Sequence, residues 1–166
     1  KPFFHVLPGT DALSFGMLGC DFKCGYCQNW LTSQALRDEN AGVTPRRVTA
    51  AGLVALASEH GCPVIASTYN EPLITAEWAR AIFERAKEAG IRCGFVSNGN
   101  ATPQVLDYLR PVLDLYKVDL KGFDKKAYAQ LGGKLDNVLR SIEQILERGL
   151  WLEVVTLVVP GFNDST

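Results

Sequence analysis

The sequence predicts an α/β fold, an incomplete parallel (β/α) barrel formed as one domain over residues 1–166. Two observations carry this prediction. Short apolar runs alternate with helical patterns along the chain, and that alternation implies a parallel sheet with right-handed crossovers and helices outside it. The apolar runs are continuous, as expected for strands buried on both faces. Five such units fall short of an eight-stranded TIM barrel, which takes about 250 residues.

The expected strands lie at residues 12–18, 63–67, 91–96, 113–120 and 151–159. The expected helices lie at residues 45–60, 73–89, 102–109 and 136–148. Thr44 followed by Pro45 is typical of an N-cap and a first helical position. Gly90 and Gly149 follow the second and fourth helices, where a C-terminal glycine is common. Pro160 ends the last strand, and no repeat or linker divides the chain.

Composition excludes several classes of function. Hydrophobic residues make up 47% and charged residues 21%, with a net charge of −1, which argues against nucleic acid or an anionic membrane as the main partner. No apolar run is long enough to span a bilayer, and no signal peptide is recognisable. Five cysteines, three of them within eight residues, form a poor disulfide framework and favour a cytoplasmic location. Because the chain begins at Lys1 and stops at Thr166 just after a strand, we expect a fragment of a longer protein.

Polar residues gather after each expected strand, where parallel α/β proteins place their chemistry. The polar loops comprise the cysteine loop with residues 28–29, then residues 68–72, 97–100, 119–121 and 160–164. Because the carboxyl ends of parallel strands share one edge, the sequence predicts a shared cofactor site across it.

Three cysteines, Cys20, Cys24 and Cys27, fall within eight residues. Three thiolates on one short loop can hold an inorganic centre and leave a coordination position open, so that the centre can bind a substrate. Gly19 and Gly25 allow the backbone to turn sharply there. The loop therefore indicates an inorganic centre that takes part in a reaction.

The alternative to a reactive centre is a structural zinc site, or an iron–sulfur module that only transfers electrons. Zinc wants a fourth protein ligand, and the candidates lie outside the loop without a recognisable pairing: Cys62, Cys93, His5 and His60. We therefore favour iron–sulfur. Cys62 and Cys93 are expected in the core, His60 at the surface, and His5 has no clear partner in the sequence.

The cysteine spacing C-x3-C-x2-C, with Tyr26 before the last cysteine, resembles the signature of radical S-adenosylmethionine (radical SAM) enzymes. Asn70-Glu71-Pro72 stands where that superfamily often has Gly-Gly-Glu-Pro, and Ser97-Asn98-Gly99 resembles its Thr-Asn-Gly. Two further motifs resemble the branch of pyruvate formate-lyase activating enzymes, Asp119-Leu120-Lys121 and Val159-Pro160-Gly161. Residues 5–9 and 27–30 are most similar to the radical enzymes of the AmmeMemoRadiSam system. The resemblance covers nearly the whole chain.

The resemblance implies an oxidoreductase with a [4Fe–4S] cluster on Cys20, Cys24 and Cys27, whose fourth iron is chelated by S-adenosylmethionine. An electron from the cluster would cleave the cofactor and give a 5′-deoxyadenosyl radical that abstracts hydrogen from a substrate, in the manner of a glycyl-radical activase. It implies an electron donor of the flavodoxin or ferredoxin type. The substrate would be a small molecule, a peptide or a protein. No side chain is assigned to catalysis beyond the two cofactors.

The resemblance also implies a set of cofactor contacts. Glu71 would face the ammonium of the methionine moiety, and Lys121 would approach its carboxylate. Tyr26 would border the adenine. The remaining members of the set are Asn29, Asn70, Ser97, Asn98 and Asp119.

Two positions depart from the family pattern. Tyr69-Asn70 replaces the Gly-Gly pair, and Val96 stands where some activating enzymes have an aspartate that helps bind a monovalent cation. The plainer interpretation of Glu71 is a loop residue, with Asn70 capping the next helix.

Overall fold

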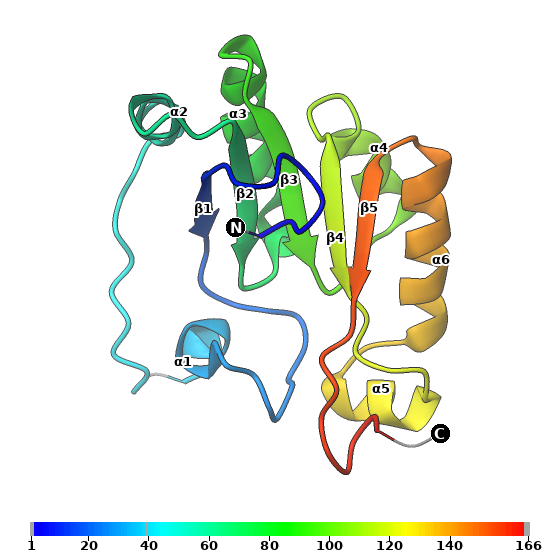
Figure 1. Ribbon diagram of the computed structural model, residues 1–166. Coiled ribbons are helices and arrows are strands. Elements are labelled where there is room, and N and C mark those ends of the chain that lie inside the picture. The colour runs from blue at the N-terminus through cyan, green and yellow to red at the C-terminus, as the bar shows by residue number, and fades with distance from the viewer. Residues whose placement is uncertain (1, 39, 165–166) are drawn as a thin grey trace.

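The structure is a computed structural model that describes residues 2–38 and 40–164 (Figure 1). Five parallel strands form one sheet in the order β1-β2-β3-β4-β5. They are β1 Ala12–Gly16, β2 Val64–Tyr69, β3 Arg92–Ser97, β4 Leu115–Asp119 and β5 Trp151–Val155. Each crossover advances by one strand, as in the wall of a barrel, so the predicted fold class is confirmed. Lys1 and Thr166, on which the expectation of a fragment rested, lie outside the described residues.

Helices follow each of the first four strands. They are α1 Trp30–Ser33, α2 Ala50–Glu59, α3 Ala76–Glu88, α4 Pro103–Leu109, α5 Lys125–Leu131 and α6 Leu135–Glu147, with 3-10 turns η1 Ala35–Arg37 and η2 Pro72–Thr75. Figure 1 shows α3 and α4 on one side of the sheet and the N-terminal segment crossing its other side. Among the described helices, none combines the length and the apolar character needed to cross a membrane.

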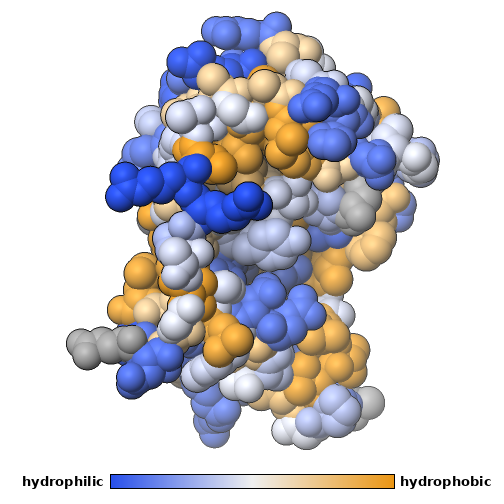
Figure 2. All heavy atoms as spheres, turned by 90° about the vertical axis from the view of Figure 1, so that its left-hand side faces the viewer, coloured by the Kyte–Doolittle hydropathy of each residue, from blue (hydrophilic) through white to orange (hydrophobic). Residues whose placement is uncertain are grey.

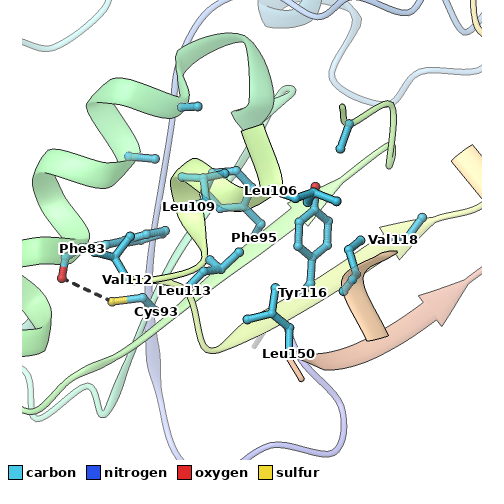
Figure 3. Close-up of a cluster of buried hydrophobic side chains, with 14 of the residues drawn as sticks. Phe83, Cys93, Phe95, Leu106, Leu109, Val112, Leu113, Tyr116, Val118 and Leu150 are labelled. Atoms are coloured by element: carbon cyan, nitrogen blue, oxygen red, sulfur yellow. Dashed lines mark hydrogen bonds between the residues drawn. The ribbon is translucent and has the colours of Figure 1, made fainter. Parts of the chain in front are cut away.

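The face of the sheet toward the helices is packed with apolar rings. Phe83 from α3, Phe95 from β3 and Tyr116 from β4 are fully buried, with ring centroids 5.7 Å and 5.8 Å apart in succession. Figure 3 shows these rings beside leucines of α4. Cys93 is buried there with its Sγ 3.7 Å from the Phe83 carbonyl oxygen, and Cys62 is also buried. Both cysteines are therefore core residues, as predicted.

The opposite face of the sheet is covered by the N-terminal segment, residues 2–7. Phe3 and Val6 pack there against Val64, Ala66 and Leu115. Phe3 packs directly over Gly94 of β3. A Cβ at position 94 would lie 2.5 Å from the Phe3 ring, so a larger residue there would displace the ring.

A buried ion pair fastens the N-terminal segment to that face. Lys117 on β4 and Glu153 on β5 lie in register, with Nζ and Oε2 3.4 Å apart and both side chains buried. The Glu153 carboxylate accepts from the backbone N–H groups of Phe4 at 3.0 Å and His5 at 2.9 Å, and Lys117 donates to the Pro2 carbonyl. His5 thus has a partner that the sequence did not reveal, since its Nδ1 also lies 3.4 Å from Glu153. Buried charges are tolerated where they are paired and hydrogen-bonded in this way.

Two expected boundaries are wrong. The first long helix begins at Ala50 rather than after Thr44, because the Thr49 hydroxyl accepts the Gly52 N–H at 3.0 Å and caps it there. The last strand ends at Val155, which pairs with the last residue of β4, Asp119, so that no backbone partner continues beyond it.

Two further expectations also need correction. The strands are not all buried on both faces, since Trp151 and Val154 of β5 are 50% and 45% exposed. Helix α5 is not among the expected helices, and its first residues, Lys125 and Lys126, form a short charged run. Its limits are marked by Asp124, which caps the Ala127 N–H at 2.7 Å, and by Gly132 in the left-handed region.

One side of the molecule carries exposed apolar residues. Figure 2 faces the side on which β1 and α1 lie and shows apolar surface in its lower half. Trp30, Leu31 and Leu36 of α1 and η1 are 49%, 68% and 72% exposed. These side chains belong to the segment that directly follows the cysteine loop.

We predict that Gly16→Ala destabilises the protein and disturbs the entry to the cysteine loop. A Cβ at position 16 would lie 2.1 Å from the Tyr69 carbonyl oxygen, which also accepts the Met17 N–H at 2.6 Å. The backbone must then move, and the free energy of unfolding is expected to fall by about 1–3 kcal/mol. Urea denaturation of the metal-free protein measures this loss.

Gly25→Ala is the matched control, because no atom lies within 4 Å of a Cβ at that position. Its free energy of unfolding should change by less than about 0.5 kcal/mol. Equal effects of the two substitutions would contradict the close approach at Gly16.

Candidate functional site

The cysteine loop leaves the carboxyl end of β1 and leads into α1. Cys24 is buried, Cys20 and Cys27 are partly exposed, and all three are free thiols. The Cys27 N–H donates to the Cys24 carbonyl at 3.1 Å, and Gly19 takes a φ of 98°, so the loop folds back on itself. The three sulfur donors are thereby kept at one edge of the sheet.

Asn70, directly after β2, holds both ends of the cysteine loop. Its Nδ2 donates to the Met17 carbonyl at 2.9 Å, and its Oδ1 accepts from the Thr32 hydroxyl at 2.9 Å. One side chain thus joins the residue that enters the loop to a residue in α1. Gln34 adds a further contact, donating through Nε2 to the Phe22 carbonyl at 3.3 Å.

Glu71 links the loops that follow β2 and β3. Its carboxylate is 1% exposed and accepts from the Ser97 hydroxyl at 2.8 Å, the Asn98 N–H at 2.7 Å and the Leu73 N–H at 3.0 Å. Burial raises the pKa of Glu71 to about 7, although these hydrogen bonds favour the charged form. Glu71 also caps η2, so the interpretation in which Asn70 is the cap is wrong.

Lys121 and Asp119 lie at the carboxyl end of β4, with Nζ and Oδ2 3.3 Å apart. The Lys121 N–H donates to the Tyr128 hydroxyl at 2.9 Å, which fixes this end against α5. Burial raises the pKa of Cys24, and the Lys121 ammonium opposes that rise. A cation therefore stands close to the cysteine loop.

Tyr26 packs against Phe162 from the loop after β5, with ring centroids 5.3 Å apart. Its hydroxyl is buried and has no hydrogen-bond partner among residues 2–38 and 40–164. The Asn163 amide holds this loop by donating to the Lys121 carbonyl at 3.0 Å. Asn29 lies just before α1, where its carbonyl accepts the Ser33 N–H at 2.8 Å.

Two of the thiols, Cys20 and Cys24, favour protonation in the absence of a metal, because burial raises the pKa of Cys20 to about 12 and raises that of Cys24 as well. Metal binding to cysteine requires the thiolate, so loading this loop would release protons.

Within the described ranges, no three His, Cys, Asp or Glu side chains are close enough to share one metal ion. An iron–sulfur cubane makes no such demand, since each cysteine binds a different iron atom of the cluster. The donor set of three thiols on one loop fits such a cluster.

A model of the radical SAM superfamily matches residues 15–166 of this chain. The chain belongs to the radical SAM superfamily. Members of this superfamily use a [4Fe–4S] cluster and S-adenosylmethionine. The matched region contains all five polar loops at the carboxyl edge, the cysteine loop among them.

Two archaeal proteins are similar in sequence to this radical SAM chain. The uncharacterized protein MJ0808 of Methanocaldococcus jannaschii is 35% identical over 168 residues, which cover 99% of this chain and 48% of the relative. The uncharacterized protein MJ0804 of the same organism is 32% identical over 106 residues, covering 61% of this chain and 37% of the relative. The chain thus spans less than half the length of these curated relatives.

Solved structures share the fold. A structure of TYW1 with a lysine–pyruvate adduct bound has a TM-score of 0.58 and 16% identity, over 91% of this chain and 57% of that one. The cobalamin-dependent S-adenosylmethionine radical enzyme OxsB, with aqua-cobalamin bound, has a TM-score of 0.60 and 12% identity, over 87% of this chain and 23% of that one. At these identities the likeness concerns the fold alone.

The structure brings the sequence-predicted site residues to the carboxyl edge of the sheet. Ser97 and Asp119 are the last residues of β3 and β4, and the others lie on the loops that follow β1, β2, β3 and β4. Sequence reasoning missed residues of the same edge that hold those loops, namely Asp21, Asn100, Tyr128, Asn137, Phe162 and Asn163. A usable signal existed for some of them, since asparagine is frequent in the polar loops at positions 98, 100 and 163.

We predict that Glu71 makes the metal-free protein less stable as pH rises. Its pKa is about 7 in the folded chain against an ordinary value of 4.5. The folded state therefore favours the protonated form, and this stabilisation is complete below about pH 4.5 and lost as pH rises through 7. Between about pH 5 and pH 8 the loss is on the order of 3 kcal/mol.

Urea denaturation of the wild type and of Glu71→Gln over that pH range isolates this contribution, because glutamine does not titrate. The difference in unfolding free energy between the two proteins should vary with pH as described. Glu143→Gln, an exposed residue on α6, serves as the control and should follow the wild-type curve. A constant difference between wild type and Glu71→Gln would show that Glu71 titrates normally.

Proposed function

We propose that this chain is the catalytic core of a radical SAM enzyme in which Cys20, Cys24 and Cys27 hold the [4Fe–4S] cluster. The observation that carries the proposal is the position of these three free thiols. They lie on a loop at the carboxyl end of β1, beside polar loops from the neighbouring strands. Three cysteines leave one iron without a protein ligand, which is the position that a substrate-binding cluster needs.

When bound, the reduced cluster supplies the electron that splits S-adenosylmethionine into methionine and a 5′-deoxyadenosyl radical. The protein holds the reactants and keeps water away from the radical. Buried Phe22 and Cys24 form the apolar side of the loop toward the core. Phe162 covers Tyr26 from the opposite loop.

We assign the methionine carboxylate to Lys121, because its ammonium already acts on Cys24 and is only partly neutralised by Asp119 at 3.3 Å. A lysine–carboxylate contact is a charge-assisted hydrogen bond. The adenine is assigned to Tyr26, whose buried hydroxyl has no partner within the described part of the chain.

The other proposed cofactor contacts come from side chains that differ in how many hydrogen bonds they already form within the protein. Glu71, Ser97 and Asn98 bind one another, so they reach the methionine ammonium as one rigid group. The Asn70 amide is occupied at both ends by the cysteine loop and contributes through that loop. Asn29 borders the site beside α1.

The motifs at residues 119–121 and 159–161 support an enzyme of the glycyl-radical-activase type, an oxidoreductase that takes electrons from a flavodoxin- or ferredoxin-like donor. A cytoplasmic location suits its five free thiols. The substrate is a small molecule, a peptide or a protein. Because this chain matches less than half of each curated relative, substrate contacts outside these residues are part of the proposal.

We predict that Cys24→Ala abolishes both cluster binding and cofactor cleavage. After anaerobic reconstitution, the wild type should contain about four iron atoms and four acid-labile sulfides per chain and release 5′-deoxyadenosine under reduction. The variant should lose both properties because two thiolates no longer hold the cluster. Metal and sulfide analysis with chromatography of the nucleoside products measures them.

Cys62→Ala is the matched control, since Cys62 is a buried thiol outside the loop, and it should retain cluster and cleavage. Unchanged cleavage by Cys24→Ala would overturn the proposal. One zinc ion per wild-type chain without sulfide would instead support the structural metal module.

We also predict that Lys121→Gln weakens S-adenosylmethionine binding about tenfold, through loss of one charge-assisted contact. Equilibrium dialysis of the reconstituted protein measures the Kd. Lys126→Gln removes an exposed charge on α5 and should leave the Kd unchanged. Equal affinities in all three proteins would remove Lys121 from the site.

A further inference from the structure

Asp21 lies directly after Cys20 and is the acceptor at the centre of a partly buried amide network. Its Oδ1 accepts from Asn98 Nδ2 at 2.7 Å, and its Oδ2 accepts from Asn100 Nδ2 at 2.8 Å. Asn100 Oδ1 in turn accepts from Asn137 Nδ2 at 2.7 Å. The carboxylate on the cysteine loop is therefore connected to the loop after β3 and to α6.

The direction of each hydrogen bond in this network is fixed by the backbone. Asn98 Oδ1 accepts the Asn100 N–H at 2.8 Å, so Asn98 Nδ2 must face Asp21. Asn137 Nδ2 also donates to the Ala101 carbonyl at 3.4 Å, which keeps its donor group toward Asn100. Only an acceptor fits at position 21, and a carboxylate supplies one on each oxygen.

The same carboxylate lies against the first cysteine, with Cys20 Sγ and Asp21 Oδ1 3.8 Å apart. Two short hydrogen bonds from separate residues leave it little freedom to rotate. An immobile charge at this place acts on whatever the sulfur binds. The potential of an iron–sulfur cluster depends on nearby charge and on hydrogen bonds around its sulfurs.

We propose that Asp21 is a positioning residue with two effects on the cluster. It orients Cys20 through the network of Asn98, Asn100 and Asn137, and its negative charge lowers the reduction potential of the cluster. This inference rests on the proposed function, in that Cys20 is a ligand. Outer contacts of this kind commonly change metal affinity by about 10- to 100-fold.

An exchange of the carboxylate at position 21 with the amide at position 100 tests both effects. Asp21→Asn removes the charge and turns an amide donor toward Asn100 Nδ2. Asn100→Asp places two carboxylates against each other. The double variant Asp21→Asn, Asn100→Asp restores every hydrogen bond with the roles reversed, because Asn137 can donate to either side chain at position 100.

The full chain is reconstituted anaerobically, and iron loss to a chelator is timed beside an EPR-monitored redox titration. Each single variant should lose iron about tenfold faster than the wild type, and the double variant should return to the wild-type rate. Asp21→Asn should favour the reduced cluster about tenfold, a shift of about 59 mV for a one-electron couple. The reduction potential of the double variant should lie between those of Asp21→Asn and the wild type, because the negative charge has moved from position 21 to position 100.

Asp11→Asn, an exposed residue at the start of β1, makes the same charge change and should alter neither property. If Asn100→Asp does not fold, Asn100→Ala removes one donor from Asp21 and should also speed iron loss. Failure of the double variant to recover the wild-type rate overturns the orienting effect. A potential of Asp21→Asn equal to that of the wild type overturns the charge effect.

The two proposals fail in different ways. A wild-type chain that takes up no iron and sulfide overturns the proposed function, and this inference with it. A loaded wild type that releases 5′-deoxyadenosine, together with an Asp21→Asn variant of unchanged iron retention and potential, overturns the inference alone.

Discussion

Loops that leave the carboxyl ends of parallel strands have no ladder of backbone hydrogen bonds to hold them, so side chains must do so. In this protein a few short polar residues take that part. Glu71 accepts three hydrogen bonds in a fully buried position and joins the loops after β2 and β3. Asn70 joins the two ends of the cysteine loop. The geometry offered to any cofactor depends on these contacts as well as on the cysteines, because a lost partner leaves a charge or an amide unsatisfied.

The two faces of the sheet are stabilised by different means. Toward the helices, the neighbouring aromatic rings of Phe83, Phe95 and Tyr116 pack against one another as an ordinary apolar core. On the other face, a buried lysine and glutamate interrupt the apolar surface and bind the backbone of residues 2–5. A pair of this kind contributes little net stability but strongly selects one arrangement of the chain that satisfies it.

The sequence predicted the parallel sheet and the common edge well, because continuous apolar runs separated by helices allow few topologies. It also placed the cysteine loop and the motifs around Glu71 and Lys121 on that edge. Local signals were less reliable. Thr44-Pro45 and Thr49 both look like helix starts, and only the tertiary structure selects the second. Helix α5 was not predicted, because it begins with the charged pair Lys125-Lys126. Its capping residues are Asp124 and Gly132.

The hydrogen-bond networks could not be predicted from the sequence, since nothing local relates Asp21 to Asn98 or Asn137, or Glu153 to Phe4. Asp21 and Asn98 are 77 residues apart in the chain, and Phe4 and Glu153 are 149 residues apart, so these partners meet only after the sheet has formed. The sequence shows which residues are polar, whereas the fold decides which of them face one another.

The N-terminal segment has a consequence for how the sheet can receive other molecules. Residues 2–7 fill the surface beside the first half of β2 and β4, with Phe3 over Gly94 and the Phe4 ring 3.9 Å from the Lys117 ammonium. That part of the sheet face is therefore covered by the chain itself. A shortened protein that lacks these few residues would leave the Lys117–Glu153 pair without its backbone partners and would expose apolar side chains of β2 and β4 to water.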